Sequence, residues 1–191
     1  MKRFTTKRSM QGFSLIEVLI VVSITLTVAG MAVPKMMTTL ADLGLSGGVH
    51  SAAGLIQQAR MDAIKNNKFR KVRYANSATS GRVFIDYNDN SQPDSNEPQV
   101  QLGNAVLAYS TPTGVPALST TDLGYTTVTT TAVGWNPVGF SCSSSTTCAV
   151  GMVMYFTDTR AMGTPGWAAV AVAPGGRVQC WVWNGSAWKQ Q

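Results

Sequence analysis

The feature that most constrains this chain is an apolar run near its N-terminus, FSLIEVLIVVSITLTVAGMAV, at residues 13–33. It carries a single charged residue, Glu17. At a rise of about 1.5 Å per residue, a helix of this length reaches about 31 Å, which matches the hydrocarbon thickness of a bilayer. The sequence therefore predicts a membrane-spanning helix.

The positive charge of the chain is concentrated before this run. Of the 15 Lys and Arg residues, four (Lys2, Arg3, Lys7 and Arg8) precede residue 13, which leaves 11 against nine Asp and Glu in the rest. Cations beside a spanning helix favour the cytoplasmic side, so we expect a cytoplasmic N-terminus. The net charge of +6 reports mainly this tail and gives little support for a nucleic-acid partner.

Glu17 needs an explanation, because an ionisable residue inside a spanning helix is costly without a partner. In a secretory signal the small-residue cleavage site follows the apolar core, whereas here the small residue, Gly12, precedes it. A cut between Gly12 and Phe13 would free an α-amino group and make Glu17 the fifth residue of the new chain. The alternative is a plain anchor with an incidental glutamate.

The stretch KRSMQGFSLIEVLIVVSI resembles the class III leader and N-terminal helix of type IV pilins and type II secretion pseudopilins. The matching features are a short basic leader, Gly12 before the cut, Phe13 after it, Glu17 at the fifth mature position and Pro34 at the twenty-second. The resemblance implies cleavage after Gly12 by a prepilin peptidase and methylation of the Phe13 amine.

The same resemblance implies a life cycle in the cell envelope of a bacterium. The helix would hold the subunit in the inner membrane, with the globular domain in the periplasm, until the assembly platform of that membrane draws it into a filament. There Glu17 would pair with the Phe13 amine of a neighbouring pilin or pseudopilin.

Four segments follow from the pattern: a leader at 1–12, the spanning helix at 13–33, its amphipathic continuation at 34–68 and a β-rich domain at 69–191. Pro34 should kink the helix, Gly44, Gly47 and Gly48 should weaken it, and NNK at 66–68 should end it. Apolar residues at helical spacing predict a stripe that packs on the domain. They are Met36, Leu40, Leu43, Val49, Ala52, Ile56, Ala59 and Ala63.

Strand patterns fill the rest of the chain. FRKVRYA and GRVFIDY predict a hairpin, and five further candidates are VQLGNAVLA, YTTVTTTAVGW, AVGMVMYF, WAAVAVA and RVQCWVW. No second helix is indicated. We therefore expect an α+β fold in which the long N-terminal helix packs on an antiparallel, β-sandwich-like domain, as in pilins.

The C-terminal part, WNPVGFS followed by VAPGGRVQCWVW, resembles GspH/FimT-type minor pilins and pseudopilins at residues 134–140 and 175–178. The resemblance implies a place at or near the filament tip and a role in starting assembly. DNA-binding members of the FimT type carry a second basic residue two positions after the arginine. Here Arg177 is followed by Val178 and Gln179, which departs from that pattern.

The stretch DYNDNSQPDSNE has the oxygen spacing of a calcium loop. Positions 1, 3, 5, 7, 9 and 12 hold Asp86, Asn88, Asn90, Gln92, Asp94 and Glu97. Against calcium, Ser91 stands where such loops place a glycine, and a strand precedes the loop. A solvated turn rich in Asx residues explains the same composition, so calcium remains one of two interpretations.

A run of cations without an acid comprises Lys65, Lys68, Arg70, Lys71 and Arg73. Together with Arg177 it could contact DNA or an acidic partner. Alternatively it is a solvated helix end followed by an exposed strand. On that strand, alternation places Arg70 opposite Lys71 and Arg73.

Few residues suit catalysis. One histidine, His50, and three cysteines argue against a His/Cys metal site and against nucleophile–histidine chemistry, and we expect no enzyme. Cys142 and Cys148 could close a small ring worth about 2 kcal/mol, although Cys180 could replace either partner. Trp181 and Trp183 share one strand face and could pack or stack bases.

Overall fold

The computed structural model describes residues 13–103, 106–160 and 163–191. The chain divides into two compact units, one ending at Met37 and one spanning Thr38–Gln191. The elements are, in order, α1 (Leu15–Asn66), β1 (Arg70–Asn76), β2 (Gly81–Asp86), β3 (Gln99–Gln101), β4 (Val106–Tyr109), α2 (Thr120–Leu123), β5 (Thr127–Val128), β6 (Ala132–Trp135), β7 (Ser141–Cys142), β8 (Gly151–Asp158), β9 (Trp167–Val172), β10 (Val178–Trp183) and β11 (Trp188–Gln190).

Helix α1 belongs to both units and continues without a break through Pro34 and through Gly44, Gly47 and Gly48. Its end confirms the predicted boundary. Asn67 adopts a left-handed φ of 51°, and the Lys68 N–H donates to the Ala63 carbonyl at 3.1 Å. This is the Schellman arrangement, in which a left-handed residue satisfies the last carbonyls of a helix.

The predicted stripe on α1 is confirmed from Val49 to Ala63 and wrong before it. Met36, Leu40 and Leu43 are 65%, 57% and 64% exposed, because the core of the globular unit meets the helix only from Leu45 onward. The residues of α1 buried in this core are Leu45, Gly48, Val49, Ala52, Ala53, Leu55, Ile56, Ala59 and Ala63.

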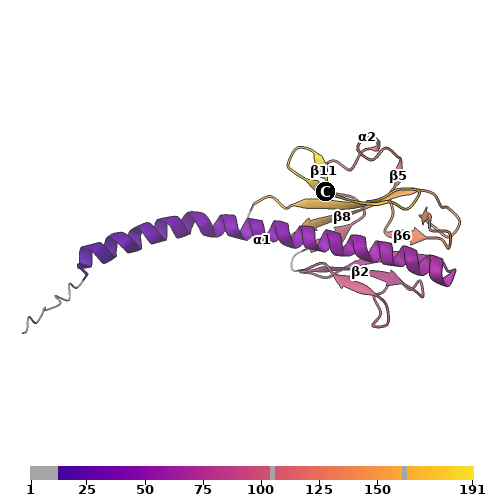
Figure 1. The fold of residues 1–191 in the computed structure, drawn as a ribbon, viewed down its shortest axis with the longest axis horizontal. Helices are drawn as coiled ribbons and strands as arrows, with labels where there is room; N and C mark the ends of the chain where they lie inside the picture. The colour runs from indigo at the N-terminus through magenta and orange to yellow at the C-terminus, as the bar shows by residue number, and fades with distance from the viewer. Residues whose placement is uncertain (1–12, 104–105, 161–162) are drawn as a thin grey trace, which may run out of the picture. The chain divides into compact units, whose positions relative to one another are not determined.

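Two sheets form the rest of the globular unit (Figure 1). The first has the order β3-β2-β1-β6-β7, and the second has the order β11-β10-β9-β8-β4 with β5 added beside β8. All pairings are antiparallel except β5 with β8. The predicted β1–β2 hairpin is confirmed, with Val72 opposite Ile85.

One hydrophobic core joins the inner faces of both sheets to α1. Ile56 of α1, Trp135 of β6 and Phe156 of β8 are all fully buried in it. A second cluster covers the outer face of the second sheet, where Tyr155, Trp181 and Trp188 pack under Leu118 and Leu123. Strands β8 and β9 are therefore buried on both faces, and the predicted fold of a long helix packed on antiparallel sheets is confirmed.

Two of the strand predictions were wrong, because each predicted run forms one strand in each sheet. VQLGNAVLA forms β3 in the first sheet and β4 in the second, and Gly103, with a left-handed φ of 88°, follows β3. YTTVTTTAVGW likewise forms β5 and β6 in different sheets. The short α2 was missed, although Ser119 and Asp122 form a capping box there.

We predict opposite effects for alanine at two glycines of α1. At Gly48 a Cβ atom would lie 2.7 Å from the Leu102 backbone carbonyl, whereas at Gly44 nothing lies within 4 Å. Gly48→Ala should therefore lower the free energy of unfolding by about 1–3 kcal/mol. Gly44→Ala should raise it by up to about 1 kcal/mol through helix propensity. Thermal unfolding of the full chain in detergent measures both, and equal melting temperatures would contradict this packing.

Candidate functional site

The first part of α1 has the surface of a membrane helix. An 18-residue window reaches a mean hydropathy of 2.3, and none of that window is buried within the structure. Its apolar side chains are open to their surroundings; Leu19 and Val21, for example, are 55% and 57% exposed. An exposed apolar surface of this length is consistent with anchoring in a bilayer.

The hydroxyl groups of this segment are satisfied by the helix itself. Ser23, Thr25 and Thr27 each donate to the carbonyl four residues earlier, at 2.7–2.8 Å. Polar groups in hydrocarbon must find their partners within the protein, and this local bonding provides them. Among the described residues before Pro34, Glu17 is the one residue with an acidic or basic side chain.

Glu17 lies in the first turn of α1, where a carboxylate interacts favourably with the helix dipole. The Ser14 carbonyl accepts from the N–H groups of Glu17 and Val18 at 3.0 and 3.2 Å, and Phe13 precedes the helix with 81% of its surface exposed. Gly12 lies outside the described residues. Among the described residues, no ion pair involves Glu17.

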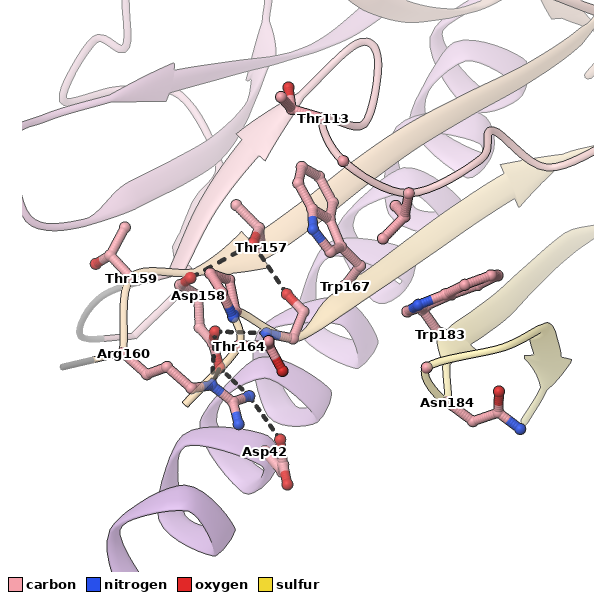
Figure 2. A pocket seen from close by; sticks show the side chains of 15 residues that line it. Asp42, Thr113, Thr157, Asp158, Thr159, Arg160, Thr164, Trp167, Trp183 and Asn184 are labelled. Carbon is pink, nitrogen blue, oxygen red and sulfur yellow. Dashed lines mark hydrogen bonds and ion pairs between the residues drawn. The ribbon is translucent and has the colours of Figure 1, made fainter. Parts of the chain in front are cut away.

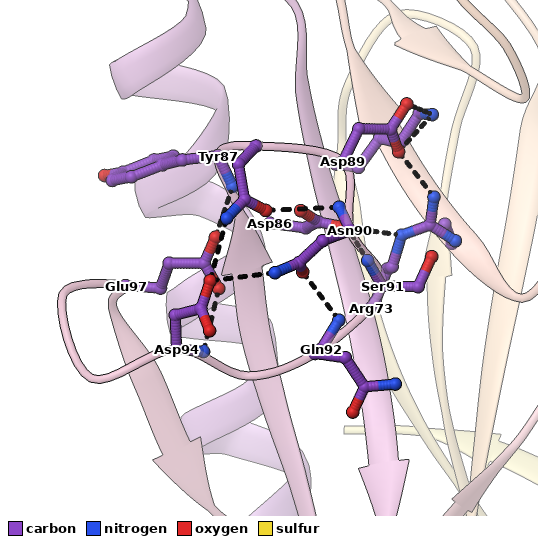
Figure 3. A network of polar contacts seen from close by, with 12 residues as sticks. Arg73, Asp86, Tyr87, Asp89, Asn90, Ser91, Gln92, Asp94 and Glu97 are labelled. Atoms are coloured by element: carbon purple, nitrogen blue, oxygen red, sulfur yellow. Dashed lines mark hydrogen bonds and ion pairs between the residues drawn. The ribbon is translucent and has the colours of Figure 1, made fainter.

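The acidic loop at 86–97 and the cation run meet in the structure (Figure 3). The Arg73 Nε donates to Asp86 at 2.8 Å, and its Nη2 donates to Asp89 at 2.7 Å. The Lys71 ammonium donates to both Asp89 oxygens, at 2.6 and 2.7 Å. These bonds lower the pKa of Asp89, with the bond from Lys71 contributing most. The acidic loop and the cation run, which are separate in the sequence, are therefore joined by ion pairs.

The carboxylates of Glu97 and Asp94 take donors from the loop itself, whereas the second oxygen of Asp86 has no hydrogen-bond partner among the described residues. Glu97, only 4% exposed, accepts from the Tyr87 and Asp94 N–H groups. The Asp94 carboxylate accepts from the side-chain amides of Asn88 and Asn90 at 2.8 and 2.9 Å. Among the described residues no three His, Cys, Asp or Glu side chains are arranged to hold a metal ion. The six predicted ligands share one loop without converging on a cation, so this geometry does not fit calcium.

The other cations of the run divide as alternation predicted. Arg70 points away from Lys71 and Arg73, bonds Asp62 of α1 at 2.5 Å and lies over the Tyr87 ring at 4.3 Å. Lys68 is exposed at the helix end and Arg177 is exposed after the turn that precedes β10. Three of the six cations predicted to contact DNA or an acidic partner, Arg70, Lys71 and Arg73, are thus engaged with carboxylates.

Arg60 of α1, which the sequence reasoning missed, joins the two C-terminal turns at 134–140 and 175–178. Its guanidinium donates to the carbonyls of Gly139, Gly176 and Gly175 at 3.0, 3.1 and 3.1 Å, and it lies 5.5 Å from the centre of the Trp135 ring. A Cβ atom at Gly176 would lie 2.6 Å from Arg60, so the turn requires glycine. The signal available in the sequence was an arginine directly after Ala59, a residue of the predicted apolar stripe.

Cys142 and Cys148 form a disulfide, and Cys180 is a free thiol on β10. Burial raises the pKa of the Cys180 thiol. The tryptophans face away from Cys180, as alternation predicted. Trp181 is 7% exposed in the outer cluster, and Trp183 packs edge-on against Trp188 with ring centres 5.6 Å apart. These rings therefore serve packing in the globular unit.

An open pocket of about 890 Å³ lies beside the end of β8 (Figure 2). Its charged wall is Arg160, which bonds the buried Asp158 at 2.9 Å and Asp42 of α1 at 2.6 Å. Trp167 and Trp183 line another side. Because both carboxylates are used by Arg160, the cluster ties the loop after β8 to α1. Sequence reasoning did not identify this cluster, because Asp42 lies far along the chain from Asp158 and Arg160.

Comparison with known proteins identifies one feature. The prokaryotic N-terminal methylation motif matches residues 7–33. No curated protein and no solved structure matches the chain. Together with the long apolar helix and the antiparallel sheets, the motif supports a processed, type IV pilin-like protein. Such proteins are generally structural and assemble with other pilins after processing by a prepilin peptidase.

We predict that Arg60 fixes the two C-terminal turns to α1. Arg60→Ala removes three hydrogen bonds from a charged donor and should lower the free energy of unfolding by about 2–4 kcal/mol. Arg60→Lys should lose less, because one ammonium reaches fewer carbonyls. Arg82→Ala is the control, since Arg82 has one side-chain bond, to Gln99 at 3.2 Å. Thermal unfolding in detergent measures the series, and equal losses for Arg60→Ala and Arg82→Ala would contradict the assignment.

Proposed function

We propose that this protein is a minor pilin or pseudopilin of the GspH/FimT type. A prepilin peptidase cleaves it after Gly12 and methylates the Phe13 amine. The helix at 13–33 holds it in the inner membrane, with the N-terminus cytoplasmic and the globular domain periplasmic. The subunit then enters a type IV pilus or type II secretion pseudopilus, at or near the tip, and primes its assembly.

One observation carries this proposal: an exposed carboxylate, Glu17, is the one acidic side chain among the described residues 13–33, the apolar segment that matches the methylation motif. A carboxylate in hydrocarbon is stabilised by a nearby cation, and removing one partner of such a pair is strongly destabilising. Cleavage before Phe13 creates an amine four residues from Glu17. In a filament the amine of one subunit and the Glu17 of another complete the pair, which draws processed subunits together.

The GspH/FimT type is supported by the way Arg60 uses the C-terminal part of the chain. The turns at 134–140 and 175–178, which carry the resemblance, both bind the guanidinium of Arg60. Because both turns bind the same residue of α1, there is a physical reason for the two sequence matches to occur in one chain. This links the sequence resemblance to a physical contact.

We predict that two substitutions separate processing from assembly. Gly12→Val should leave the leader uncleaved, because a branched side chain replaces the small residue before the cut; an immunoblot then shows the longer precursor. Glu17→Gln should be cleaved normally and should be absent from sheared filaments, because the amine loses its carboxylate partner. Ser14→Ala is the control and should behave as wild type. Normal filament incorporation of both variants would refute the proposal.

DNA binding during uptake is the competing function, and the arrangement of charges disfavours it. Arg70, Lys71 and Arg73 already pair with carboxylates, so contacts to phosphates would require these pairs to break. We expect no gel shift of double-stranded DNA by the full chain in detergent at 150 mM salt. A shift there that Arg177→Gln or Lys68→Gln weakens would favour the DNA function instead.

A further inference from the structure

Apolar side chains that the core does not cover gather at the C-terminal end of α1. Met61 and Ile64 of the helix are 71% and 49% exposed, and Val138 and Phe140, in the turn between β6 and β7, are 73% and 43% exposed. We call these four residues the α1-end patch. A Cβ atom at Gly139 would lie 2.9 Å from the Ile64 Cδ1, so the helix and the turn form one surface. Exposed apolar side chains that adjoin one another within a polar rim mark interaction sites.

Hydrogen bonds fix the turn that carries part of this patch. The Asn136 side-chain carbonyl accepts from the N–H groups of Val138 and Phe140, at 3.2 and 2.8 Å. The Gly139 carbonyl accepts from Arg60 of α1 at 3.0 Å, which attaches the turn to the helix. A partner therefore meets a preorganised surface, and binding orders fewer groups than it would on a free loop.

Exposed cations surround the α1-end patch. Lys65 lies one helical turn after Met61 on the same face of α1, and Lys68 follows the helix end. Arg177 lines a pocket of about 390 Å³ together with Met61. No ion pair joins these three cations to another described residue, and Asp62, the acid on this part of α1, is bonded to a cation of β1 at 2.5 Å. The rim of the patch is therefore positive.

A second copy of this chain is poorly suited to cover the patch. In a symmetric dimer the same surface meets itself, and the positive rims of the two copies would repel each other. The acids that could face the rim in another arrangement are engaged elsewhere. Of the nine, five form ion pairs, three accept hydrogen bonds within their own loop or helix cap, and Glu17 lies in the apolar segment. The charges thus favour a different protein as the partner.

We propose that the α1-end patch binds an acidic, amphipathic segment of another protein. The apolar side chains of that segment cover Met61 and Val138, and its carboxylates pair with Lys65 and Arg177. The pocket beside Met61 has room for one of its side chains. Glu17 lies in the first turn of α1 and takes no part in this surface, so the binding does not depend on the proposed assembly.

The experiment uses the full chain in phosphatidylcholine nanodiscs and three fluorescent peptides of about 16 residues, which is about four helical turns. The first peptide alternates pairs of Leu and Glu, the second has Lys in place of Glu, and the third has Ser in place of Leu. Fluorescence anisotropy, corrected with empty nanodiscs, should show that the first peptide binds at least about 10-fold more tightly than either of the others. Added salt should weaken this binding, because it screens the rim charges.

Substitutions in the patch should weaken binding of the first peptide. Met61→Ser and Val138→Ser should each raise its Kd about 10-fold, because each removes an apolar contact. Leu43→Ser is the matched control, since Leu43 is 64% exposed elsewhere on α1, and should bind as wild type. Lys65→Glu should also raise the Kd about 10-fold, whereas Lys189→Glu, at an exposed position of β11, should not. All five variants should melt within about 2 °C of wild type, because the side chains are exposed.

Equal affinity for the acidic and basic peptides, or no binding of the first peptide, would overturn the proposal. So would binding that is unchanged in both Met61→Ser and Val138→Ser. Association of two chain-bearing nanodiscs that Met61→Ser abolishes would assign the patch to a second copy. Displacement of the peptide by a short DNA duplex would assign it to nucleic acid, and either result would also overturn the proposal.

Discussion

The structure of the globular unit depends on the burial of one face of α1, from Leu45 to Ala63, against both sheets. Neither sheet has another layer on this inner face, so the helix supplies the apolar surface that closes the core. Small residues make the close approach possible. Gly48 lies against the Leu102 carbonyl, and Ala52, Ala59 and Ala63 are fully buried. The same helix supplies the exposed apolar segment at its other end, which is long and apolar enough to cross a membrane.

Charged groups then attach the surrounding loops to this frame. Arg60 holds the two C-terminal turns, Arg70 of β1 pairs with Asp62 of the helix, and Arg160 connects Asp158 to Asp42. In each case an arginine connects two different segments of the fold, which suits its several donors in a fixed planar arrangement. The acidic loop follows the same rule, with Arg73 bridging Asp86 and Asp89. Glu17 differs from these acids because no ion pair joins it to another described residue, and the proposed function assigns its partner to another subunit.

The sequence predicted what depends on local pattern. The helix end at Asn66, the β1–β2 hairpin and the opposite orientation of Arg70 and Lys71 follow from periodicity and turn residues. It predicted wrongly where one run of strand-forming residues crosses between sheets, as in VQLGNAVLA, because propensity does not identify a strand's partner. It also extended the buried stripe to Met36, since helical spacing cannot show where the covering domain begins.

By itself, the sequence determined the apolar helix, the methylation motif at residues 7–33 and the isolated carboxylate within it, because these properties depend on composition and spacing along one segment. Only the tertiary structure decided the fate of the other charges. Whether Lys71 and Arg73 face solvent, and whether Asp86 faces a metal ion or an arginine, depends on which segments fold against each other. The electrostatic energy of two charges falls with their separation in space, and their separation along the chain does not reveal that distance.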